Sequence, residues 1–336
     1  MCIRDSPKVL GPTAESNRPE IAQVLFRKNE IIKTNNLERD LYEARKKIEK
    51  LSRESQLNSF YICSLSSRSI VYKGMFLAEA LADFYFDLKD KSKVDSMPDC
   101  DVVVHMAATN GTRLFYETPT DVTFNNTLPT FNIVDRYKDT PTKIVFTSTC
   151  EIFNGTIDKG LYDIPTNEQV PIMFEDITNA RWSYSIPKAL GENLISNLKT
   201  HWLIIRYFNV YGPGQKDHFI SEFVNRVKNK EYYIKGNDTR SFCYIDDAIQ
   251  MTHNLIENVN NKIVNVGHQE EIQIETVAMC IMDIMGVDPT KLEIKSGPVG
   301  SAKRRCPDTS LVRELTKFTN YTPLEKGLRK TVESLI

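Results

Sequence analysis

Three short apolar runs in the middle of the chain have the length and composition of buried β-strands. They are residues 101–108 (DVVVHMAA), 143–149 (KIVFTST) and 202–208 (WLIIRYF). The stretches between these runs place apolar residues at helical spacing. Strands that alternate with helices are typical of a parallel sheet covered by helices on both faces. We therefore expect an α/β core.

The part of the chain before this core has a different pattern. Residues 19–56 are rich in charge and predict helices, with Asn36 as a cap in front of an apolar face that starts at Leu37. Two β-rich runs follow at residues 60–66 and 69–74, and their closeness predicts a strand pair or hairpin.

Beyond Tyr211 the predicted strands become shorter and turns become more frequent. Residues 232–236 (YYIKG) and 263–267 (IVNVG) predict short strands, and residues 324–336 predict a last helix. This pattern favours a smaller mixed subdomain that packs on the sheet.

Composition and charge exclude several classes of protein. The chain has 336 residues, 41% of them hydrophobic and 26% charged, with a net charge of −1, so it is long enough for one large or two ordinary domains and is no bulk nucleic-acid binder. No apolar run is long enough to span a bilayer, and MCIRDSPKVL lacks the features of a secretory signal. Seven cysteines without any CxxC argue for a reducing compartment, by default the cytoplasm, and against a metal site.

The chain is poor in glycine. It has 14 glycines in 336 residues, about 4% against a usual value of about 7%. None of them falls in the spacing GxGxxG, GxxGxxG or GxxxxGK. The sequence therefore lacks a glycine-rich loop that could cradle a phosphate.

Groups able to do chemistry follow the strand at 143–149. This strand ends in Ser148 and Thr149, and Cys150 and Glu151 follow it, at the edge of the sheet where an α/β fold binds its ligand. In the next predicted helix, Tyr184 and Lys188 lie one turn apart on the same face. We expect the ammonium to lower the pKa of the phenol, so that the phenolate can take a proton from a substrate hydroxyl. Such a pair alone is weak support, since Tyr42 and Lys46 form another one.

From about Phe86 onward the chain resembles the extended short-chain dehydrogenase/reductase family of NAD-dependent nucleotide-sugar epimerases, dehydratases and decarboxylases. Eight segments occur in the order of that family: FDLKD (86–90), DVVVHMAA (101–108), NNTLPTFNIVD (125–135), FTSTCEIF (146–153), WSYSIPKALGE (182–192), RYFNVYGPGQ (206–215), TRSFCYIDD (239–247) and RRCPD (304–308).

The resemblance implies a role for each matching residue. The catalytic residues would be Tyr184 as the base, Lys188 as its partner, Thr149 as a hydroxyl on the sugar oxygen, and Glu151. The residues that bind NAD would be Asp87 and Leu88 at the adenine, Ala107 and Ala108 along the cofactor, Asn126 towards the nicotinamide, and Tyr184 with Lys188. The residues on the nucleotide diphosphate of the substrate would be Asn209, Arg240 and Arg305, although a turn residue and two surface ion pairs are the ordinary alternatives.

Residues around Glu151 bear on the subclass. Cys150 stands where the dehydratases have an Asp, so threonine, a small residue and glutamate resemble the sugar-nucleotide decarboxylases more closely. We expect a raised pKa for Glu151, which would suit chemistry at C5 or at a carboxylate; a solvent-facing glutamate is the alternative. Phe153 and Asn154 depart from the Tyr-Gly that is usual in the family.

Residues 7–85 resemble a second family, the amidotransferase region of the large subunit of glutamate synthase. The matching segments are VLGPTAES (9–16), PEIAQVLF (19–26), LERDLYEARKKIE (37–49) and FYICSLSSRSIVYKGM (60–75). Class II amidotransferases use an N-terminal cysteine as nucleophile, but Cys2 is followed by Ile-Arg-Asp, and MCIRDS resembles a translated sequencing adaptor.

The expected fold is therefore a truncated doubly wound (Rossmann-like) parallel sheet that lacks its first βαβ unit. An α+β amidotransferase-like fragment would precede it, and a smaller α+β substrate subdomain would follow. The expected divisions are 1–6 as an artefact, 7–85 as the glutamate synthase fragment, 86–210 as a partial NAD-binding domain and 211–336 as the nucleotide-sugar subdomain, with the join near residues 84–90.

We expect the run at 101–108 to be an exposed sheet edge with unpaired backbone groups and an uncovered apolar face, which would cause poor solubility and weak or no NAD binding. The favoured function is an NAD-dependent nucleotide-sugar epimerase or decarboxylase that is inactive as this chain. The alternatives are a glutamine amidotransferase fragment and a non-catalytic protein that binds nucleotide sugars. The family often dimerises through the two helices around the catalytic tyrosine, and we expect no nucleic acid or membrane partner.

Overall fold

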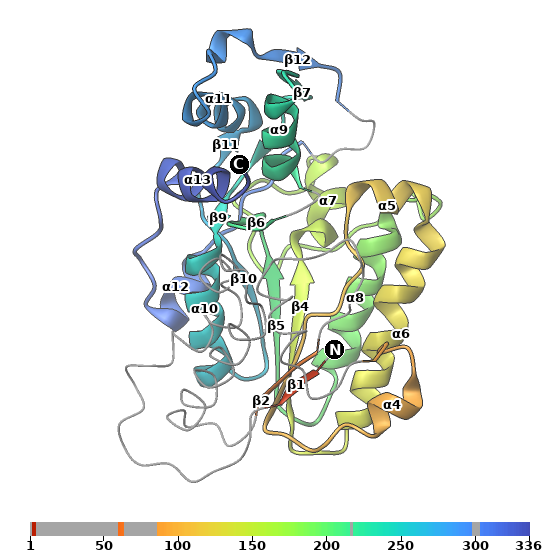
Figure 1. Ribbon diagram of the computed structural model, residues 1–336. Coiled ribbons are helices and arrows are strands. Elements are labelled where there is room, and N and C mark those ends of the chain that lie inside the picture. Colours follow the sequence, from red (N-terminus) through yellow and green to blue (C-terminus); the bar gives the residue numbers. More distant parts are fainter. Residues whose placement is uncertain (1, 5–59, 64–85, 216–217, 298–302) are drawn as a thin grey trace, which may run out of the picture.

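The computed structural model describes residues 2–4, 60–63, 86–215, 218–297 and 303–336. Its centre is a sheet of six strands in the order β1-β2-β3-β4-β5-β10 (Figure 1). These strands are β1 (Cys2–Arg4), β2 (Phe60–Cys63), β3 (Val102–His105), β4 (Lys143–Thr149), β5 (Trp202–Tyr207) and β10 (Lys262–Val266). All neighbours from β2 to β10 are parallel, and β1 is antiparallel to β2. The expected α/β core is confirmed, and β4 has the bounds expected from its sequence.

The edge of the sheet differs from the expectation. The prediction that β3 has unpaired backbone groups is wrong, because β2 runs parallel to it with Phe60 opposite Val102 and Cys63 opposite His105. The side chains of β3 are buried as well. The backbone N–H and C=O groups of an edge strand can pair with any extended segment, whatever its side chains. The short run FYIC can therefore take the position next to β3. Of the strand predicted at 60–66, residues 60–63 are confirmed, whereas residues 64–66, the predicted partner at 69–74 and the predicted helices at 19–56 lie outside the described residues.

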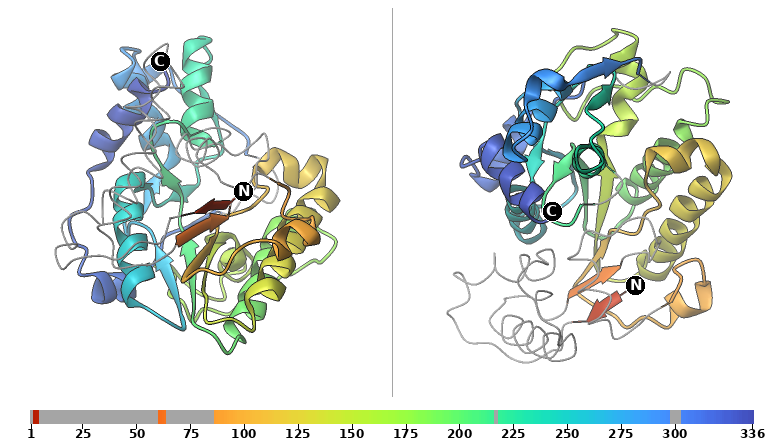
Figure 2. Two further views of the ribbon diagram at one scale, coloured as in Figure 1. Left: turned by 60° about the horizontal axis from the view of Figure 1, so that its bottom comes forward. Right: turned by 45° about the horizontal axis from the view of Figure 1, so that its top comes forward.

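Helices cover both faces of the sheet (Figure 2). On one face, α4 (Lys91–Asp95), α6 (Pro119–Tyr137) and α8 (Trp182–Ser196) pack over a core that includes Val103, Ile133, Ile144, Phe146 and Ile204. On the other face, α10 (Ile245–Asn258) and α12 (Ser310–Thr316) pack over Val104, Val145, Ile205, Val264 and Val312. Burial on both faces explains why the strand sequences are continuously apolar rather than alternating.

Helices α6 and α8 approach each other and the sheet closely at Gly191. A Cβ added there would lie 2.7 Å from Phe146 Cζ and 3.3 Å from Thr130 Cγ2. The absence of a side chain at this position brings the helix that carries Tyr184 and Lys188 against the end of β4.

The second unit lies beyond the carboxyl ends of the strands, at the top of Figure 1. Its helices are α9 (Phe219–Lys228), α11 (Ile274–Ile284) and α13 (Leu324–Glu333), which share a core with Phe223, Val277 and Leu328. Its two-stranded sheets pair β6 (Val210–Tyr211) with β9 (Cys243–Tyr244), β7 (Tyr233–Lys235) with β12 (Glu293–Lys295), and β8 (Thr239–Arg240) with β11 (Ile272–Gln273). A short 3-10 helix, η3 (Pro289–Lys291), precedes β12.

Strand β10 corrects one part of the sequence interpretation. The sequence predicts that the run at 263–267 belongs to the smaller subdomain. In the structure, β10 instead pairs in parallel with β5 of the main sheet, with Val264 opposite Ile205. Its buried Val264 and Val266 complete the core below α10 and α12. A strand that returns to the main sheet after a long excursion cannot be recognised from its own five residues, because its pairing depends on distant chain. No helix within the described ranges is long and apolar enough to cross a bilayer.

Candidate functional site

The site is built around the carboxyl end of β4 and the first turns of α8. The 3-10 helix η2 (Cys150–Phe153) follows β4 directly, and α7 (Asn154–Asp158) follows η2. The Thr149 hydroxyl accepts a hydrogen bond from the backbone N–H of Glu151 at 3.2 Å, which fixes the turn between the strand and η2. The Tyr184 phenol lies close enough to the same hydroxyl for Thr149 to act on its pKa. The structure therefore brings together the two hydroxyl groups that the sequence predicts.

Tyr184 lies under a second aromatic ring. Phe115, from α5 (Thr112–Glu117), stacks on it with ring centroids 5.3 Å apart and an interplanar angle of 11°. Both side chains are buried. This burial raises the pKa of Tyr184, the negative charge of Glu151 raises it further, and the nearby Thr149 hydroxyl lowers it by less.

Lys188 has a different role from the one expected. Its Nζ donates to the backbone oxygen of Thr147 at 2.7 Å and lies 6.0 Å from the centroid of the Tyr184 ring. Burial lowers the pKa of Lys188 to about 7, although the charge of Glu192 acts in the opposite direction. The prediction that this ammonium lowers the pKa of Tyr184 is wrong for the structure described, because burial outweighs the attraction of a lysine that is itself easily neutralised.

Glu151 is the centre of a cluster of arginines. Its Oε1 lies 2.6 Å from Arg305 Nη2, its Oε2 lies 3.2 Å from Arg181 Nη2, and Asn154 Nδ2 donates to Oε2. Burial alone would raise the pKa of Glu151, but Arg305, Arg181 and Arg240 together hold it below the usual value. The expectation of a raised pKa is therefore wrong, and so is the alternative of a solvent-facing glutamate, since the side chain is only 19% exposed.

The predicted substrate residues border this cluster. Arg240 lies 3.5 Å from Asp238, and burial together with the charge of Arg305 lowers its pKa to about 10. Asn209 has φ 35° and donates from Nδ2 to the Ser241 oxygen at 3.0 Å, so it serves as a turn residue and also ties β5 to the segment of Arg240. The side chains of Arg240 and Arg305 are each 12% exposed, which excludes the ordinary alternative that they form surface ion pairs.

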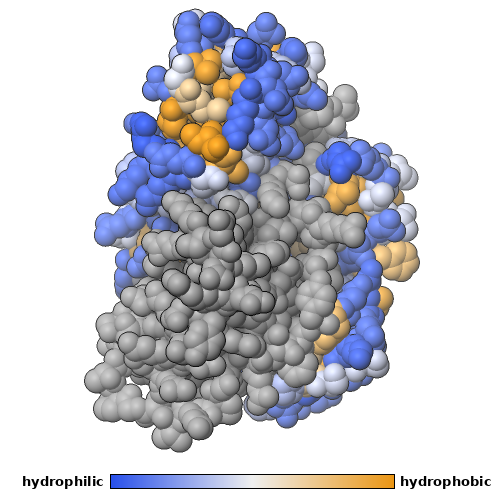
Figure 3. All heavy atoms as spheres, in the orientation of Figure 1, coloured by the Kyte–Doolittle hydropathy of each residue, from blue (hydrophilic) through white to orange (hydrophobic). Residues whose placement is uncertain are grey.

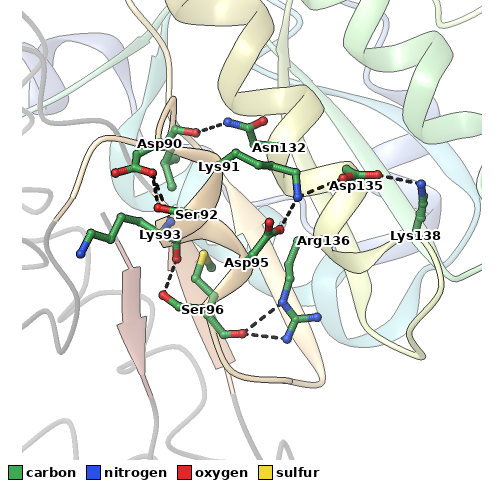
Figure 4. Close-up of polar contacts among 12 residues, drawn as sticks. Asp90, Lys91, Ser92, Lys93, Asp95, Ser96, Asn132, Asp135, Arg136 and Lys138 are labelled. Atoms are coloured by element: carbon green, nitrogen blue, oxygen red, sulfur yellow. Dashed lines mark hydrogen bonds and ion pairs between the residues drawn. The ribbon is translucent and has the colours of Figure 1, made fainter.

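The residues predicted at the adenine end of NAD lie in one turn before α4. Leu88 is buried and Asp87 is exposed, and Asn132 of α6 donates to the backbone oxygens of Leu88 and Lys89 at 2.8 and 3.2 Å. Lys91 of α4 forms an ion pair with Asp95 in the same helix and a second one with Asp135 of α6, which joins the two helices (Figure 4). The turn is therefore fixed on α6 by polar contacts.

The other predicted cofactor residues follow β3. Ala107 is buried, and Ala108 packs near Tyr184. Asn126 is buried; its Oδ1 accepts from the backbone N–H of Thr109 and its Nδ2 donates to the Thr109 oxygen. Its side chain therefore holds the turn after β3 in shape. An ammonium has three donors and Lys188 uses one on Thr147, so the donor set fits ribose hydroxyls. The described residues thus fit the adenosine and ribose ends of NAD, while the chain after β2 lies outside them.

A buried ion pair beneath the site was missed by the sequence analysis. Arg206 of β5 contacts Glu192 of α8 through Nη2–Oε2 at 2.6 Å and Nε–Oε1 at 2.9 Å, and Ser148 Oγ donates to Oε1 at 2.5 Å. Both charged side chains are at most 5% exposed. Arg181 and Asn154 were also missed as site residues. The only feature of the sequence that pointed to Glu192 as a neighbour of the site was its position one turn after Lys188 on the same helix face.

Comparison with known proteins identifies the family. A model of the NAD dependent epimerase/dehydratase family matches residues 66–267, more than half of the chain, and the chain belongs to this family. A UDP-N-acetyl-alpha-D-glucosaminuronate decarboxylase from Bacillus cytotoxicus is 30% identical over 249 residues, which cover 69% of this chain and 76% of the relative. UDP-glucose 4-epimerase from Thermotoga maritima, solved with UDP-glucose, has the same fold, with a TM-score of 0.67 at 22% identity over 75% of this chain and 84% of that one.

The start of the chain matches a second family. A model of class-II glutamine amidotransferases matches residues 3–110. The large chain of NADPH glutamate synthase from Azospirillum brasilense is 51% identical over 83 residues, which are 25% of this chain and only 6% of the relative. Both resemblances expected from the sequence are confirmed, and the two family matches overlap at residues 66–110.

Proposed function

We propose that residues 86–336 form the nucleotide-sugar site of an NAD-dependent epimerase or decarboxylase. The observation that carries this proposal is the meeting of Thr149, Tyr184 and Lys188 at the end of β4, next to the buried cluster of Glu151 and Arg305. The Thr149 and Tyr184 hydroxyls would hold one oxygen of the sugar, and Tyr184 would exchange a proton with that oxygen as it changes between hydroxyl and carbonyl. NAD supplies the acceptor and donor of hydride when it is bound.

The arginine cluster supports a substrate with negative charge. Glu151 carries one negative charge, while Arg181, Arg240 and Arg305 carry three positive charges around it; Asp238 is paired with Arg240, and the charge of Asp158 also acts on Arg305. The guanidinium donors of this cluster suit a diphosphate or a sugar carboxylate. We propose Arg240, Arg305 and Asn209 as the diphosphate residues. The ion-paired Glu151 would act as an ionised acceptor of hydrogen bonds from sugar hydroxyls, and the likeness to the Bacillus cytotoxicus decarboxylase supports a uronic acid substrate.

We further propose that this chain binds NAD weakly. Its sequence has no glycine-rich loop to bind the pyrophosphate, so the adenine turn at Asp87 and the ribose donors of Lys188 would act without it. Calorimetry of the purified chain should show binding of UDP-glucuronate but little or no binding of NAD. Tight NAD binding would contradict the proposed impairment, and loss of UDP-glucuronate binding would contradict the proposed site.

A non-catalytic sugar-nucleotide protein is the alternative to an enzyme. The two are separated by Tyr184→Phe, which removes the proton acceptor and keeps the ring that stacks on Phe115. With NAD in large excess, a residual conversion of UDP-glucuronate that disappears in this variant, at unchanged sugar-nucleotide affinity, supports the enzyme. Binding that is equal in both proteins without any conversion supports the alternative.

We also propose that the chain joins two unrelated polypeptides near residues 84–90. The overlap of the two family matches and the 6% coverage of glutamate synthase support this origin, and Cys2, which lies in β1 opposite Cys63, does not begin an amidotransferase-like Cys-Gly motif. Uninterrupted long reads of genomic DNA across codons 80–95 test it. A continuous reading frame in such reads would defeat the proposal.

Exposed apolar side chains on α6 support a homodimer. Phe124, Leu128 and Phe131 lie on one face of this helix and are 40–61% exposed, and Leu190 of the adjacent α8 is 42% exposed. Figure 3 shows apolar side chains along the right-hand edge of the molecule, over α5 and α6. The same helices of a second copy are the proposed occupant, since an isologous contact would pair these side chains with themselves.

Sedimentation of the Phe124→Asp/Phe131→Asp variant tests this arrangement. The variant should sediment as a monomer while the unchanged chain forms dimers, because two carboxylates would be buried without partners. Exchange of the exposed Ile177, which lies far from α6 in the sequence and is 72% exposed, for Asp is the control and should leave the dimer intact. A monomeric unchanged chain would contradict the proposal.

A further inference from the structure

Asn154 contacts both partners of the central ion pair. It is the first residue of α7, follows η2 without a break and is only 2% exposed. Its Nδ2 donates to Glu151 Oε2, and its Oδ1 accepts from Arg305 Nε at 3.1 Å. Arg305 lies 151 residues further along the chain, so this one amide connects the end of β4 to the segment 303–308.

Only one orientation of the amide fits these neighbours. A carboxylate accepts hydrogen bonds and cannot donate them, whereas a guanidinium donates and cannot accept. The NH2 group of Asn154 must therefore face Glu151 and its oxygen must face Arg305. An amide is the smallest side chain that supplies both a donor and an acceptor in this way, and an aspartate would supply acceptors only.

The charged and titratable groups around Glu151 come from several elements. Arg181 precedes α8, Tyr184 lies within it, Arg240 lies in β8, Arg305 lies in the segment before α12, and the Cys150 thiol belongs to η2. Arg181 and Arg305 contact the carboxylate directly, and Asn154 is its only neutral hydrogen-bond donor from a side chain among the described residues. The Nε atom of Arg181 is buried without a hydrogen-bond partner.

We propose that Asn154 is a positioning residue that joins the carboxylate of Glu151 and the guanidinium of Arg305 into one unit, which keeps Glu151 an ionised acceptor and holds Arg305 for an anionic group of the nucleotide sugar. The ligand in this statement rests on the proposed function, whereas the linkage of the three side chains rests on the contacts alone.

The linkage is tested without a ligand. The free energy of unfolding of the chain and of Asn154→Ala is measured by denaturant from neutral pH to the acid range. The difference at neutral pH should correspond to about a tenfold change in the folding equilibrium, the size of one hydrogen bond to a charged group, and should shrink on acidification as Glu151 takes up a proton. In a Glu151→Gln background the effect of Asn154→Ala should no longer depend on pH.

Asn132→Ala is the matched control. Asn132 is a buried amide in the same chain, but its side chain donates only to backbone oxygens, so the loss caused by its removal should be independent of pH in this range. Asn154→Asp keeps the acceptor for Arg305 and places a second carboxyl group beside Glu151, so it should show a stronger pH dependence than Asn154→Ala. A loss in Asn154→Ala that is as insensitive to pH as that in Asn132→Ala overturns the inference.

Binding of UDP tests the second half of the proposal. Calorimetry should show about tenfold weaker UDP binding in Asn154→Ala and unchanged binding in Asn132→Ala. Equal affinities of the unchanged chain and Asn154→Ala would overturn the role in holding Arg305 for an anion. If the unchanged chain binds no UDP while the pH-dependent linkage is present, the proposed function and the ligand half fail, and the linkage of Asn154 with Glu151 stands.

Discussion

Burial decides the protonation of His105, a residue for which the sequence gives only its place at the end of β3. The side chain is fully buried, and Nε2 is 2.9 Å from the Thr130 hydroxyl. Burial lowers the pKa of His105 to about 3, and the positive charge of Lys188 contributes in the same direction. The ring is therefore neutral in the folded protein at physiological pH.

This pKa predicts a loss of stability in acid. The unfolded chain binds a proton at His105 below its ordinary pKa of about 6.5, while the folded chain resists protonation down to about 3. Stability should fall as the pH decreases through this window, because the unfolded state binds more protons there. His105→Gln should flatten the dependence of the unfolding free energy on pH between about 6.5 and 3. An identical slope in both proteins would show that His105 does not titrate in this way.

At the scale of single residues, the sequence identified Thr149, Tyr184 and Lys188 as neighbours because they occupy fixed positions on one strand end and one helix face. It did not predict their charge states. The pKa of Glu151 is lowered because Arg305 and Arg181 come from distant parts of the chain, and that of Lys188 is lowered by the side chains that cover it. Burial and distant charges are properties of the folded chain alone.

Among the elements, α8 depends on one buried ion pair for its position on the sheet. Arg206 holds Glu192 in two parallel contacts, and its Nη1 also donates to the backbone oxygen of Glu168 at 2.8 Å. The pair therefore joins α8, β5 and the loop before α8. Because both groups are removed from water, either partner left alone would be a buried charge without compensation.

Arg206→Met should destabilise the chain by about 3–5 kcal/mol, since among the described residues Glu192 then keeps one side-chain hydrogen bond, from Ser148, and the attraction of Lys188, whose own pKa is lowered by burial. Arg206→Met combined with Glu192→Leu should cost clearly less, because no charge remains buried. Denaturant unfolding of the two single variants and the double variant gives this comparison. Additive losses in the double variant would mean that the two side chains act independently.

The bounds of β4, the start of α13 and the existence of α8 followed from local patterns, because apolar periodicity and helix-forming residues act within a few positions. The pairing of β10 with β5 did not, because its strand is short and its partner lies about 60 residues earlier, between Trp202 and Tyr207. Periodicity shows which face of an element is apolar, and leaves open which other element covers that face.

For the molecule as a whole, β2 completes the sheet with a strand from the amidotransferase-like segment. It lies between β1 and β3, so each backbone N–H of its middle residues faces one neighbour or the other. The described part of the sheet therefore holds β3 as an inner strand, and the region 60–63 belongs to the same folded unit as residues 102–105.

Ile62→Pro tests whether this pairing contributes to stability. Proline removes one N–H from the ladder and should destabilise the chain by about 1–3 kcal/mol, because an acceptor is left unsatisfied. Ile62→Val keeps the backbone donor and is the matched control. Thermal unfolding of both variants measures the difference. If they unfold at the same temperature, residues 60–63 do not stabilise the sheet, as would hold for a fragment that merely precedes the enzyme-like part.

The sequence by itself determined the class of fold, the family of each part of the chain and a set of proposed site residues on one strand end and one helix, because motifs and periodicity depend on neighbours along the chain. Only the tertiary structure decided that β2 pairs with β3, that Glu151 is an ion-paired acceptor, and that Asn154, Arg181 and Arg206 support the site. These features depend on contacts between residues that are as many as 151 positions apart, and on the loss of water around them. Neither is written in any local pattern.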